Sequence, residues 1–130
     1  MPVKVSFNEK ESLIIIESNG QLLRREAGWG AERVAEIFKE HAVSGILADS
    51  TLVQEQESAA LSGEMISGFV QAIEVDLPIA YIRPICWTEA YGARVRETIE
   101  DAPVNCRVFD EVDAGRAWLR EAAAHTVSSV

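Results

Sequence analysis

The order of apolar and polar residues predicts short strands that alternate with helices. Two strands come first, over residues 3–7 and 12–18, and the polar segment NEKE lies between them, which is typical of a β-hairpin. Over residues 30–41, apolar side chains recur on one helical face. The next segment, residues 44–50, is a short aliphatic run that breaks into polar residues at Asp49. Such a run predicts a strand buried on both faces of a helix-covered sheet.

The same alternation continues to the end of the chain. The further elements expected are a helix over 58–74, a strand over 77–83, a helix over 88–100, a strand over 104–109 and a helix from 110 to about 122. Thr88 and Asp110 are the first residues of two of these helical segments, and their short polar side chains favour the N-cap position. Gly28 and Gly30 weaken helix formation, so the first helix is expected to begin only at about residue 30.

This order, ββαβαβαβα, predicts an α/β fold with a mostly parallel mixed sheet, an N-terminal antiparallel hairpin and about four helices. A chain of 130 residues has a length typical of one domain. We therefore expect a single domain over residues 1–124. Residues 125–130, HTVSSV, are expected to form a disordered C-terminal tail.

The charge and hydropathy of the chain narrow its environment and partners. The formal net charge is −9 and the pI is near 4.7. Binding to nucleic acid or to an anionic membrane relies on Lys and Arg that neutralise phosphate, so this balance opposes both. The longest purely aliphatic run, residues 13–16, is too short to cross a bilayer, and no membrane span is expected. The N-terminus lacks the pattern of an export signal, which predicts a cytoplasmic protein.

The carboxyl end of the central strand is the first place where function is expected. In open α/β sheets, ligands bind beyond the carboxyl ends of the strands. Asp49 and Ser50 end this strand, and Glu57 and Ser58 lie at the start of the next expected helix. These four residues are candidates for contact with a partner or a ligand.

Small residues line one flank of the helix expected over 58–74. They are Ala59, Ser62, Gly63, Ser67 and Gly68. Small side chains allow another backbone to come close. The simplest interpretation is tight packing against a neighbouring helix, and the alternative is a surface for self-association. On the second interpretation the chain is a homodimer, and Ser62 and Gly63 join the candidate partner region.

Aromatic residues raise a different hypothesis, a pocket for a small apolar ligand or a lipid. Trp29, Phe69, Trp87 and Tyr91 lie on elements that can surround such a pocket. The simpler interpretation places these aromatic side chains in the hydrophobic core, where large aromatic residues commonly lie.

Groups suited to catalysis are scarce in this sequence. His41 lies at the end of an expected helix and His125 in the expected tail, and every lysine precedes the central strand. We therefore expect no catalytic residue and no cofactor, because general acid–base and nucleophilic chemistry usually recruit His, Cys or Lys. Asp49, Glu55 and Glu57 are carboxylates that can hold a divalent cation, so a metal-dependent enzyme of unrecognised type remains an alternative.

Several short stretches of the sequence resemble the STAS-like domains typified by bacterial anti-sigma-factor antagonists. They are GQL at 20–22, ESAAL at 57–61, YG at 91–92, RVFD at 107–110 and AWL at 117–119. At 57–61 the family has Asp-Ser-Ser-Gly-Leu, and the last three stretches resemble the ending of small bacterial proteins of this SpoIIAA-like fold. The resemblance covers nearly the whole chain in the order of its elements.

The resemblance implies a SpoIIAA-like fold and a non-enzymatic regulatory or protein-interaction domain. In the phosphorylated antagonists the second serine of the motif is the phosphorylation switch, and its counterpart here is Ala59. The family's phosphorylation switch therefore does not carry over to this chain. Ser58 is the nearest hydroxyl, and we expect it to be an unmodified helix cap because Glu55 and Glu57 would repel a phosphate.

Overall fold

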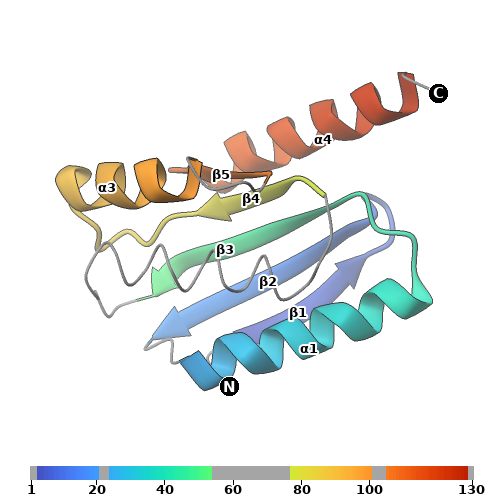
Figure 1. Cartoon of the computed structure of the whole chain (residues 1–130), viewed down its shortest axis with the longest axis horizontal. Helices are drawn as coiled ribbons and strands as arrows, with labels where there is room; N and C mark the ends of the chain where they lie inside the picture. The colour runs from blue at the N-terminus through green and yellow to red at the C-terminus, as the bar shows by residue number, and fades with distance from the viewer. Residues whose placement is uncertain (1–2, 21–23, 54–76, 101–104, 129–130) are drawn as a thin grey trace.

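A five-stranded sheet forms the middle layer of the molecule, with helices on both of its faces (Figure 1). The computed structural model describes residues 3–20, 24–53, 77–100 and 105–128. Their elements are β1 (Val3–Asn8), β2 (Leu13–Gly20), α1 (Arg24–Glu40), β3 (Gly45–Val53), β4 (Ile79–Ile82), α3 (Glu89–Glu100), β5 (Cys106–Phe109) and α4 (Val112–Ser128). The strands lie across the sheet in their order along the chain, β1-β2-β3-β4-β5.

The first two strands form the expected antiparallel hairpin, and all other neighbouring strands are parallel. Val5 pairs with Ile16 and Phe7 with Ile14, so the alternating apolar side chains of both strands lie on one face of the sheet. Every residue of β4 is buried, as expected for a strand with both faces covered. The structure thus confirms the α/β fold with its mixed sheet and N-terminal hairpin.

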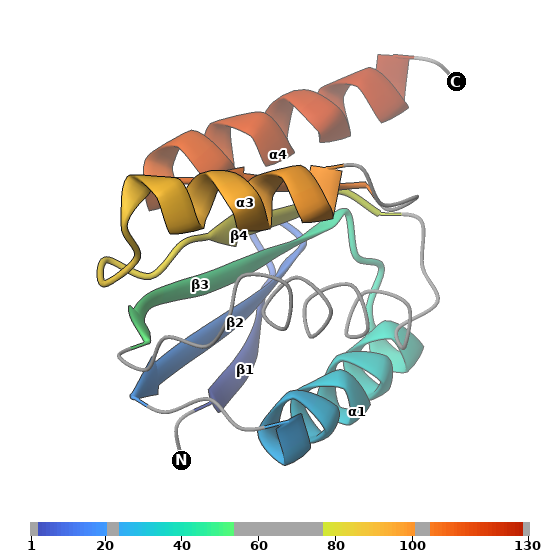
Figure 2. The same ribbon diagram turned by 60° about the vertical axis from the view of Figure 1, so that its left-hand side comes forward.

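Helices α1 and α3 lie on one face of the sheet, above the larger part of the core (Figure 2). Val34 and Ile37 of α1 and Val95 and Ile99 of α3 are buried there. The buried residues that they meet from the strands and from one loop are Val3, Ile14, Ile16, Ile46, Ile79, Tyr81, Trp87, Cys106 and Val108. Full burial of a large aliphatic or aromatic side chain stabilises the fold by roughly 1.5–3 kcal/mol, so this face is the main source of stability.

Helix α4 lies on the opposite face, over β3, β4 and β5. Leu119 of α4 is buried in a second cluster with Leu13, Leu47, Ala80 and Ile82. The close approach of the helix to the sheet requires a glycine at position 115, where an added Cβ would lie 2.8 Å from Cδ1 of Ile82. The two faces of the sheet are therefore covered unequally, by two described helices on one side and by α4 on the other.

The start of helix α1 differs from the one expected. Helix α1 begins at Arg24, so it contains Gly28 and Gly30, which were expected to precede it or to interrupt it. A glycine inside a helix costs about 1 kcal/mol relative to alanine, but most of the stability of a helix in a protein comes from packing of its apolar face. Helix α3 begins as expected, because the backbone N–H of Tyr91 donates to Oγ1 of Thr88 at 3.1 Å in an N-cap.

The last helix also differs, at both of its ends. Helix α4 begins at Val112, and the carboxylate of Asp110 is engaged by Arg83 at 2.8 Å instead of capping the helix. It continues to Ser128, through residues expected to belong to a disordered tail. Alanine has the highest helix propensity of any residue type, so the run Ala122 to Ala124 just before residue 125 favours this extension.

The helix expected over 58–74 lies outside the described residues. Three helices are described, where about four were expected in the whole chain. No helix in the described part of the chain is long and apolar enough to cross a membrane.

Candidate functional site

The parallel strands end together along one side of the sheet, which we call the carboxyl edge. It consists of residues 49–53 at the end of β3 and residues 83–88 in the connection between β4 and α3. Asp49 pairs with Glu17 of β2 on one side and with Ile82 of β4 on the other, so it lies in the middle of the sheet. This is the place at which the sequence predicts function.

Strand β3 contains a β-bulge at this edge. Glu17 pairs with Asp49, whereas Asn19 pairs with Leu52, so two steps along β2 correspond to three steps along β3. One extra residue in one strand is the definition of a bulge. The carboxylate of Asp49 holds it, because Oδ1 accepts hydrogen bonds from the backbone N–H of Thr51 at 3.0 Å and from the Thr51 hydroxyl.

Ser50 lies on the other side of β3 from Asp49 and points into the core. Its side chain is 3% exposed and shares a hydrogen bond with the hydroxyl of Tyr81. Burial raises the pKa of Tyr81 to about 12, and the hydrogen bond with Ser50 opposes part of that rise. The pair therefore anchors the start of the bulge to β4 within a dry environment.

The connection between β4 and α3 is joined to the bulge by two further hydrogen bonds. The backbone N–H of Ile85 donates to the carbonyl of Thr51 at 3.2 Å, and the thiol of Cys86 donates to the carbonyl of Val53 at 3.3 Å. Leu52 is nevertheless 64% exposed and Ile85 is 74% exposed. They are the exposed large hydrophobic residues among those described.

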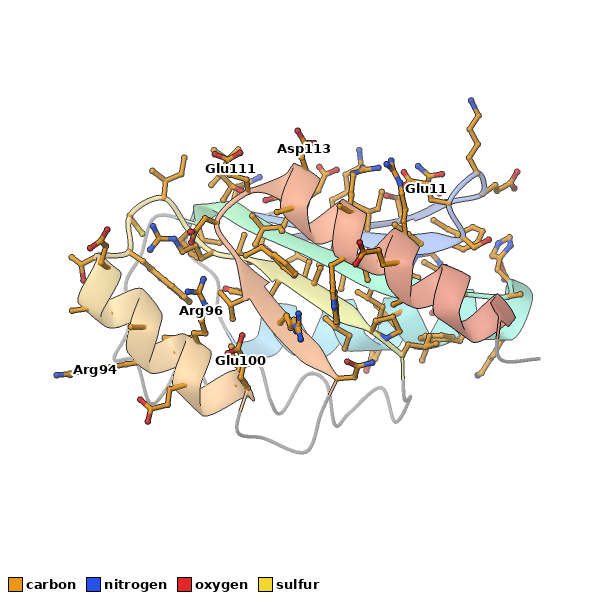
Figure 3. The ribbon with its side chains drawn as sticks, turned by 90° about the horizontal axis from the view of Figure 1, so that it is seen from above. Glu11, Arg94, Arg96, Glu100, Glu111 and Asp113 are labelled. Carbon is orange, nitrogen blue, oxygen red and sulfur yellow. The ribbon has the colours of Figure 1, made fainter. Side chains whose placement is uncertain are left out.

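An ion pair lies at the carboxyl edge, on the face of the sheet that α3 covers. Nε of Arg83 is 2.8 Å from Oδ1 of Asp110, and Nη2 of Arg96 is 3.6 Å from the same oxygen. Arg83 passes close to Gly92 of α3, where an added Cβ would lie 3.0 Å from its Nη1. Figure 3 shows that Arg96 extends from α3 toward β5, whereas Arg94 extends away from the sheet. These contacts join α3 to the start of α4 and give the arginines a structural role.

Comparison with known proteins bears on this architecture. The sequence matches no protein-family model and has no significant match among curated proteins. A solved structure of the anti-sigma-factor antagonist SpoIIAA in its unphosphorylated form is similar, with a TM-score of 0.54 and 13% sequence identity. The similarity covers 86% of this chain and 91% of the SpoIIAA chain.

The chain has the SpoIIAA-like fold. The fold implied by the short sequence stretches is therefore confirmed. At 13% identity this likeness concerns the fold, and the function has to be argued from the site itself.

Of the candidate partner residues, this SpoIIAA-like structure describes two. Asp49 is half-buried and holds the bulge, and Ser50 is buried. The remaining candidates lie outside the described residues; they are Glu57, Ser58, Ser62 and Gly63. Each of these four remains a prediction.

The aromatic residues expected around an apolar pocket are described in part. Trp87 is buried in the core, and its ring centroid lies 5.0 Å from that of Tyr91 in an edge-to-face arrangement. The ring centroids of Trp87 and Tyr81 are 6.1 Å apart, so the three rings form one packed group. Trp29 lies on α1, and Phe69 is outside the described residues. Trp87 and Tyr91 are thus packed in or against the hydrophobic core of this SpoIIAA-like fold, and their rings fill space that the pocket hypothesis assigned to a ligand.

The groups that chemistry would need are dispersed in the described part of the chain. No three His, Cys, Asp or Glu side chains gather there in a way that could hold a metal ion. The two thiols are free and lie far apart in sequence: Cys86 is exposed at the carboxyl edge, and Cys106 is buried in β5. Burial, followed by the negative charge of Glu100, raises the pKa of Cys106 to about 12, which keeps this thiol protonated and unreactive.

Sequence reasoning overlooked Leu52 and Ile85, although it directed attention to this edge. Both residues follow the ends of apolar runs, and hydrophobic residues at strand ends are usually assigned to the core. The one available signal was position: Leu52 is three residues beyond Asp49, where a buried strand had been expected to end. The bulge that exposes Leu52 depends on pairing between β2 and β3 and has no signature of its own in the sequence.

Proposed function

We propose that this protein is a non-enzymatic STAS-like regulatory domain that acts by binding another protein at its carboxyl edge. The observation that carries this proposal is the exposure of Leu52 and Ile85, at 64% and 74%, on backbone that is held by hydrogen bonds. Removing an apolar side chain from water lowers the free energy, so such residues favour contact with a partner. The SpoIIAA-like fold is consistent with this role, and SpoIIAA itself is named as an anti-sigma-factor antagonist.

The rigidity of the edge supports binding with little loss of entropy. Asp49 fixes Thr51, and the Ile85 N–H fixes the connection after β4 to the carbonyl of Thr51. A surface that is already ordered pays less conformational entropy on association than a flexible loop does. Leu52 and Ile85 are therefore presented in a fixed arrangement before any partner arrives.

The test compares the wild-type chain with the double variant L52S/I85S. Proteins captured by the tagged wild-type chain from its native host are identified, purified and titrated calorimetrically against both chains. We expect the double variant to bind at least about tenfold more weakly, the scale expected for the loss of central apolar anchors. Asn105→Ser, an exposed neutral position before β5, is the matched control and should bind like the wild type.

Equal affinities of wild type and double variant for every purified partner would contradict the proposal. Thermal unfolding of both chains checks that the double variant is folded. Native mass spectrometry of the same preparation tests the apolar-ligand alternative, which requires a co-bound molecule in most copies. Calorimetry with magnesium, manganese and calcium tests the metal-dependent enzyme, which requires tight binding that Asp49→Ala abolishes.

Self-association is a second part of the proposal, and it rests on the sequence. The small-residue flank with Ala59, Ser62, Gly63 and Ser67 lies outside the described residues. Such a flank offers close approach without charge repulsion, so we expect a homodimer by light scattering at micromolar concentration. A monomer mass that is unchanged when Ser62 or Gly63 is replaced by a large residue would rule out this surface.

A further inference from the structure

The bulge in β3 decides on which side of the sheet Leu52 lies. Leu47 faces α4, and by alternation Asp49 lies on that same side. Because Leu52 pairs with Asn19, two residues beyond Glu17 in β2, the extra residue returns Leu52 to the side of Asp49. Without the bulge, Leu52 would lie on the side of Ser50 and Tyr81, where the core is.

The next residue in the strand shows the same reversal. Val53 pairs with Gly20 and is 8% exposed, so it takes the covered side that Leu52 leaves. Helix α4 lies over β3, β4 and β5 but starts only at Val112, and it leaves Leu52 exposed. The bulge therefore moves one large apolar side chain from the core side of the sheet to an open surface.

Charged side chains lie beside Leu52 on this surface. Glu17 and Asp49 are direct neighbours in β2 and β3, and neighbouring strands are about 4.8 Å apart. Lys4 of β1 pairs with Glu17 and offsets one of the two negative charges. Arg83 does not offset the other, because it lies over Gly92 on the opposite face, paired with Asp110. Counted over the described residues, the surface around Leu52 therefore keeps a negative charge, in a chain whose net charge is −9.

We propose that the carboxyl edge binds a protein segment in which a large apolar side chain is flanked by lysine or arginine. This inference rests on the proposed function and names the chemistry of the partner. The apolar side chain contacts Leu52 and Ile85, and the flanking cation lies near Glu17 and Asp49. Charge complementarity of this kind speeds association and excludes acidic partners.

The same charges disfavour the other occupants of this edge. Two copies of the chain joined here would bring their Glu17 and Asp49 carboxylates together, and like charges in contact repel. A nucleic acid or an anionic lipid would meet the same carboxylates with its phosphates. Any homodimer is therefore expected to use a different surface.

The experiment uses three labelled synthetic helical peptides of equal length and measures fluorescence anisotropy with the full chain. One peptide alternates leucine and lysine on opposite faces, the second replaces its lysines by glutamates, and the third replaces its leucines by serines. We expect the leucine–lysine peptide to bind at least about tenfold more tightly than either of the others, since both apolar contact and charge contribute. Raising the salt from 0.05 to 0.5 M should weaken it, because exposed charges are screened.

Variants of the chain locate the peptide. L52S/I85S should weaken the leucine–lysine peptide about tenfold, and Asn105→Ser should leave it unchanged. Glu17→Gln should weaken it about twofold to fivefold, the range of a single exposed ion pair. Glu40→Gln removes an exposed carboxylate at the end of α1 and serves as the charge-matched control, with no change expected.

Three outcomes would overturn the inference: equal binding of the serine–lysine peptide, equal binding of the leucine–glutamate peptide, or unaltered binding to L52S/I85S. The failure of the proposed function looks different. If a purified native partner loses affinity for L52S/I85S but not for Glu17→Gln and shows no salt dependence, the edge is an interaction site and only the cationic character of the partner is wrong. If the native partner is indifferent to L52S/I85S, both proposals fail.

Discussion

The same parallel strands begin at one end of the sheet and end at the other, but the two ends are finished in opposite ways. At the amino end, Ser44 donates its backbone N–H to the carbonyl of Ser12 at 2.8 Å, and its hydroxyl reaches the carbonyls of Glu11 and Ser12. The carboxylate of Glu11 pairs with Arg116 and lies 3.7 Å from Arg120 of α4. The Ser44 hydroxyl and the Glu11 carboxylate are thus engaged within the chain, although Oε2 of Glu11 accepts no hydrogen bond among the described residues.

At the carboxyl edge, polar groups also hold the backbone, but apolar side chains are left in water. Asp49, Ser50 and Thr51 are all engaged internally, whereas Leu52 and Ile85 are not covered. Figure 3 shows the contrast in part, with Glu11 lying beside α4 at the closed end. Hydrogen bonds at the amino end of the strands thus join neighbouring parts of the fold, whereas those at the carboxyl edge hold a surface in place. The exposed apolar residues occur only at the second of these two described ends.

The largest difference is expected between two leucines replaced by alanine. Leu119→Ala removes a residue that is 2% exposed and packs on the amino end, so it should lower the free energy of unfolding by about 2–5 kcal/mol. Leu52→Ala should change it by less than about 0.5 kcal/mol, because little is buried. Urea unfolding measures both. Similar costs at the two positions would mean that Leu52 belongs to the core.

The stability of the core at alkaline pH depends on two buried acidic groups, the Tyr81 hydroxyl and the Cys106 thiol. Tyr81 and Cys106 have pKa values of about 12 in the folded chain, above the ordinary values of 10.0 and 9.0. Since the folded state holds these protons more tightly, their stabilisation is complete below about pH 9 and is lost as the pH rises to about 12. For Tyr81 alone this loss is about 3 kcal/mol. Urea unfolding between pH 8 and 12 should show the decline.

Substitution identifies the groups responsible for the alkaline decline. Tyr81→Phe should flatten the part above pH 10, and Cys106→Ala the part that begins near pH 9. The Phe variant should also be less stable at pH 8 by about 1 kcal/mol, because Ser50 loses a buried hydrogen-bond partner. An unchanged pH profile in both variants would show that the decline has another source.

Two glutamates, one at each end, should differ in the same sense as the leucines. The side chain of Glu11 is 20% exposed, and its replacement by Gln removes the carboxylate that pairs with Arg116. We expect a cost of about 1–2 kcal/mol, less than for a fully buried pair because the arginines are partly solvated. Glu17→Gln should cost less than about 0.5 kcal/mol, since Glu17 is exposed. Thermal unfolding at low salt compares the two, and equal costs would remove the distinction between the ends.

The two thiols provide the smallest and simplest comparison. Cys86 is exposed at the carboxyl edge, and Cys106 is buried at the start of β5. A thiol reagent such as dithionitrobenzoate should react quickly with one thiol per folded chain and with the second only after unfolding. Cys86→Ser should abolish the fast phase. Rapid reaction of Cys106 in the folded chain would show that the amino end is open.

The sequence was sufficient for the parts of this fold that depend on local pattern. The hairpin was readable from alternation, and β4 from its short aliphatic run between two prolines. The start of α1 was not, because Gly28 and Gly30 oppose a helix locally while packing against the sheet favours it. Asp110 has the local pattern of a helix cap, because a short polar residue before a helix usually is one. The residue that engages it, Arg83, lies 27 positions earlier in the chain, so the local pattern does not reveal the ion pair.

The candidate site was predictable in its place but not in its character. Asp49 was recognised because carboxylates at strand ends lie where ligands bind in this class of fold. The side of the sheet on which Leu52 lies could not be predicted in this way. It depends on one extra residue in β3 relative to β2, and the register between two strands is a long-range property. The exposure of Ile85 likewise depends on how the connection after β4 is fastened to Thr51.

Whether the carboxyl edge is a binding surface is decided by calorimetric titration of a purified native partner against wild type, L52S/I85S and Asn105→Ser, with urea unfolding of the same three samples. We expect an affinity loss of at least about tenfold for L52S/I85S alone. The three free energies of unfolding should agree within about 0.5 kcal/mol per substituted residue. Unchanged affinity in L52S/I85S, or a loss of affinity that only accompanies unfolding, would contradict the claim that the carboxyl edge is a binding surface.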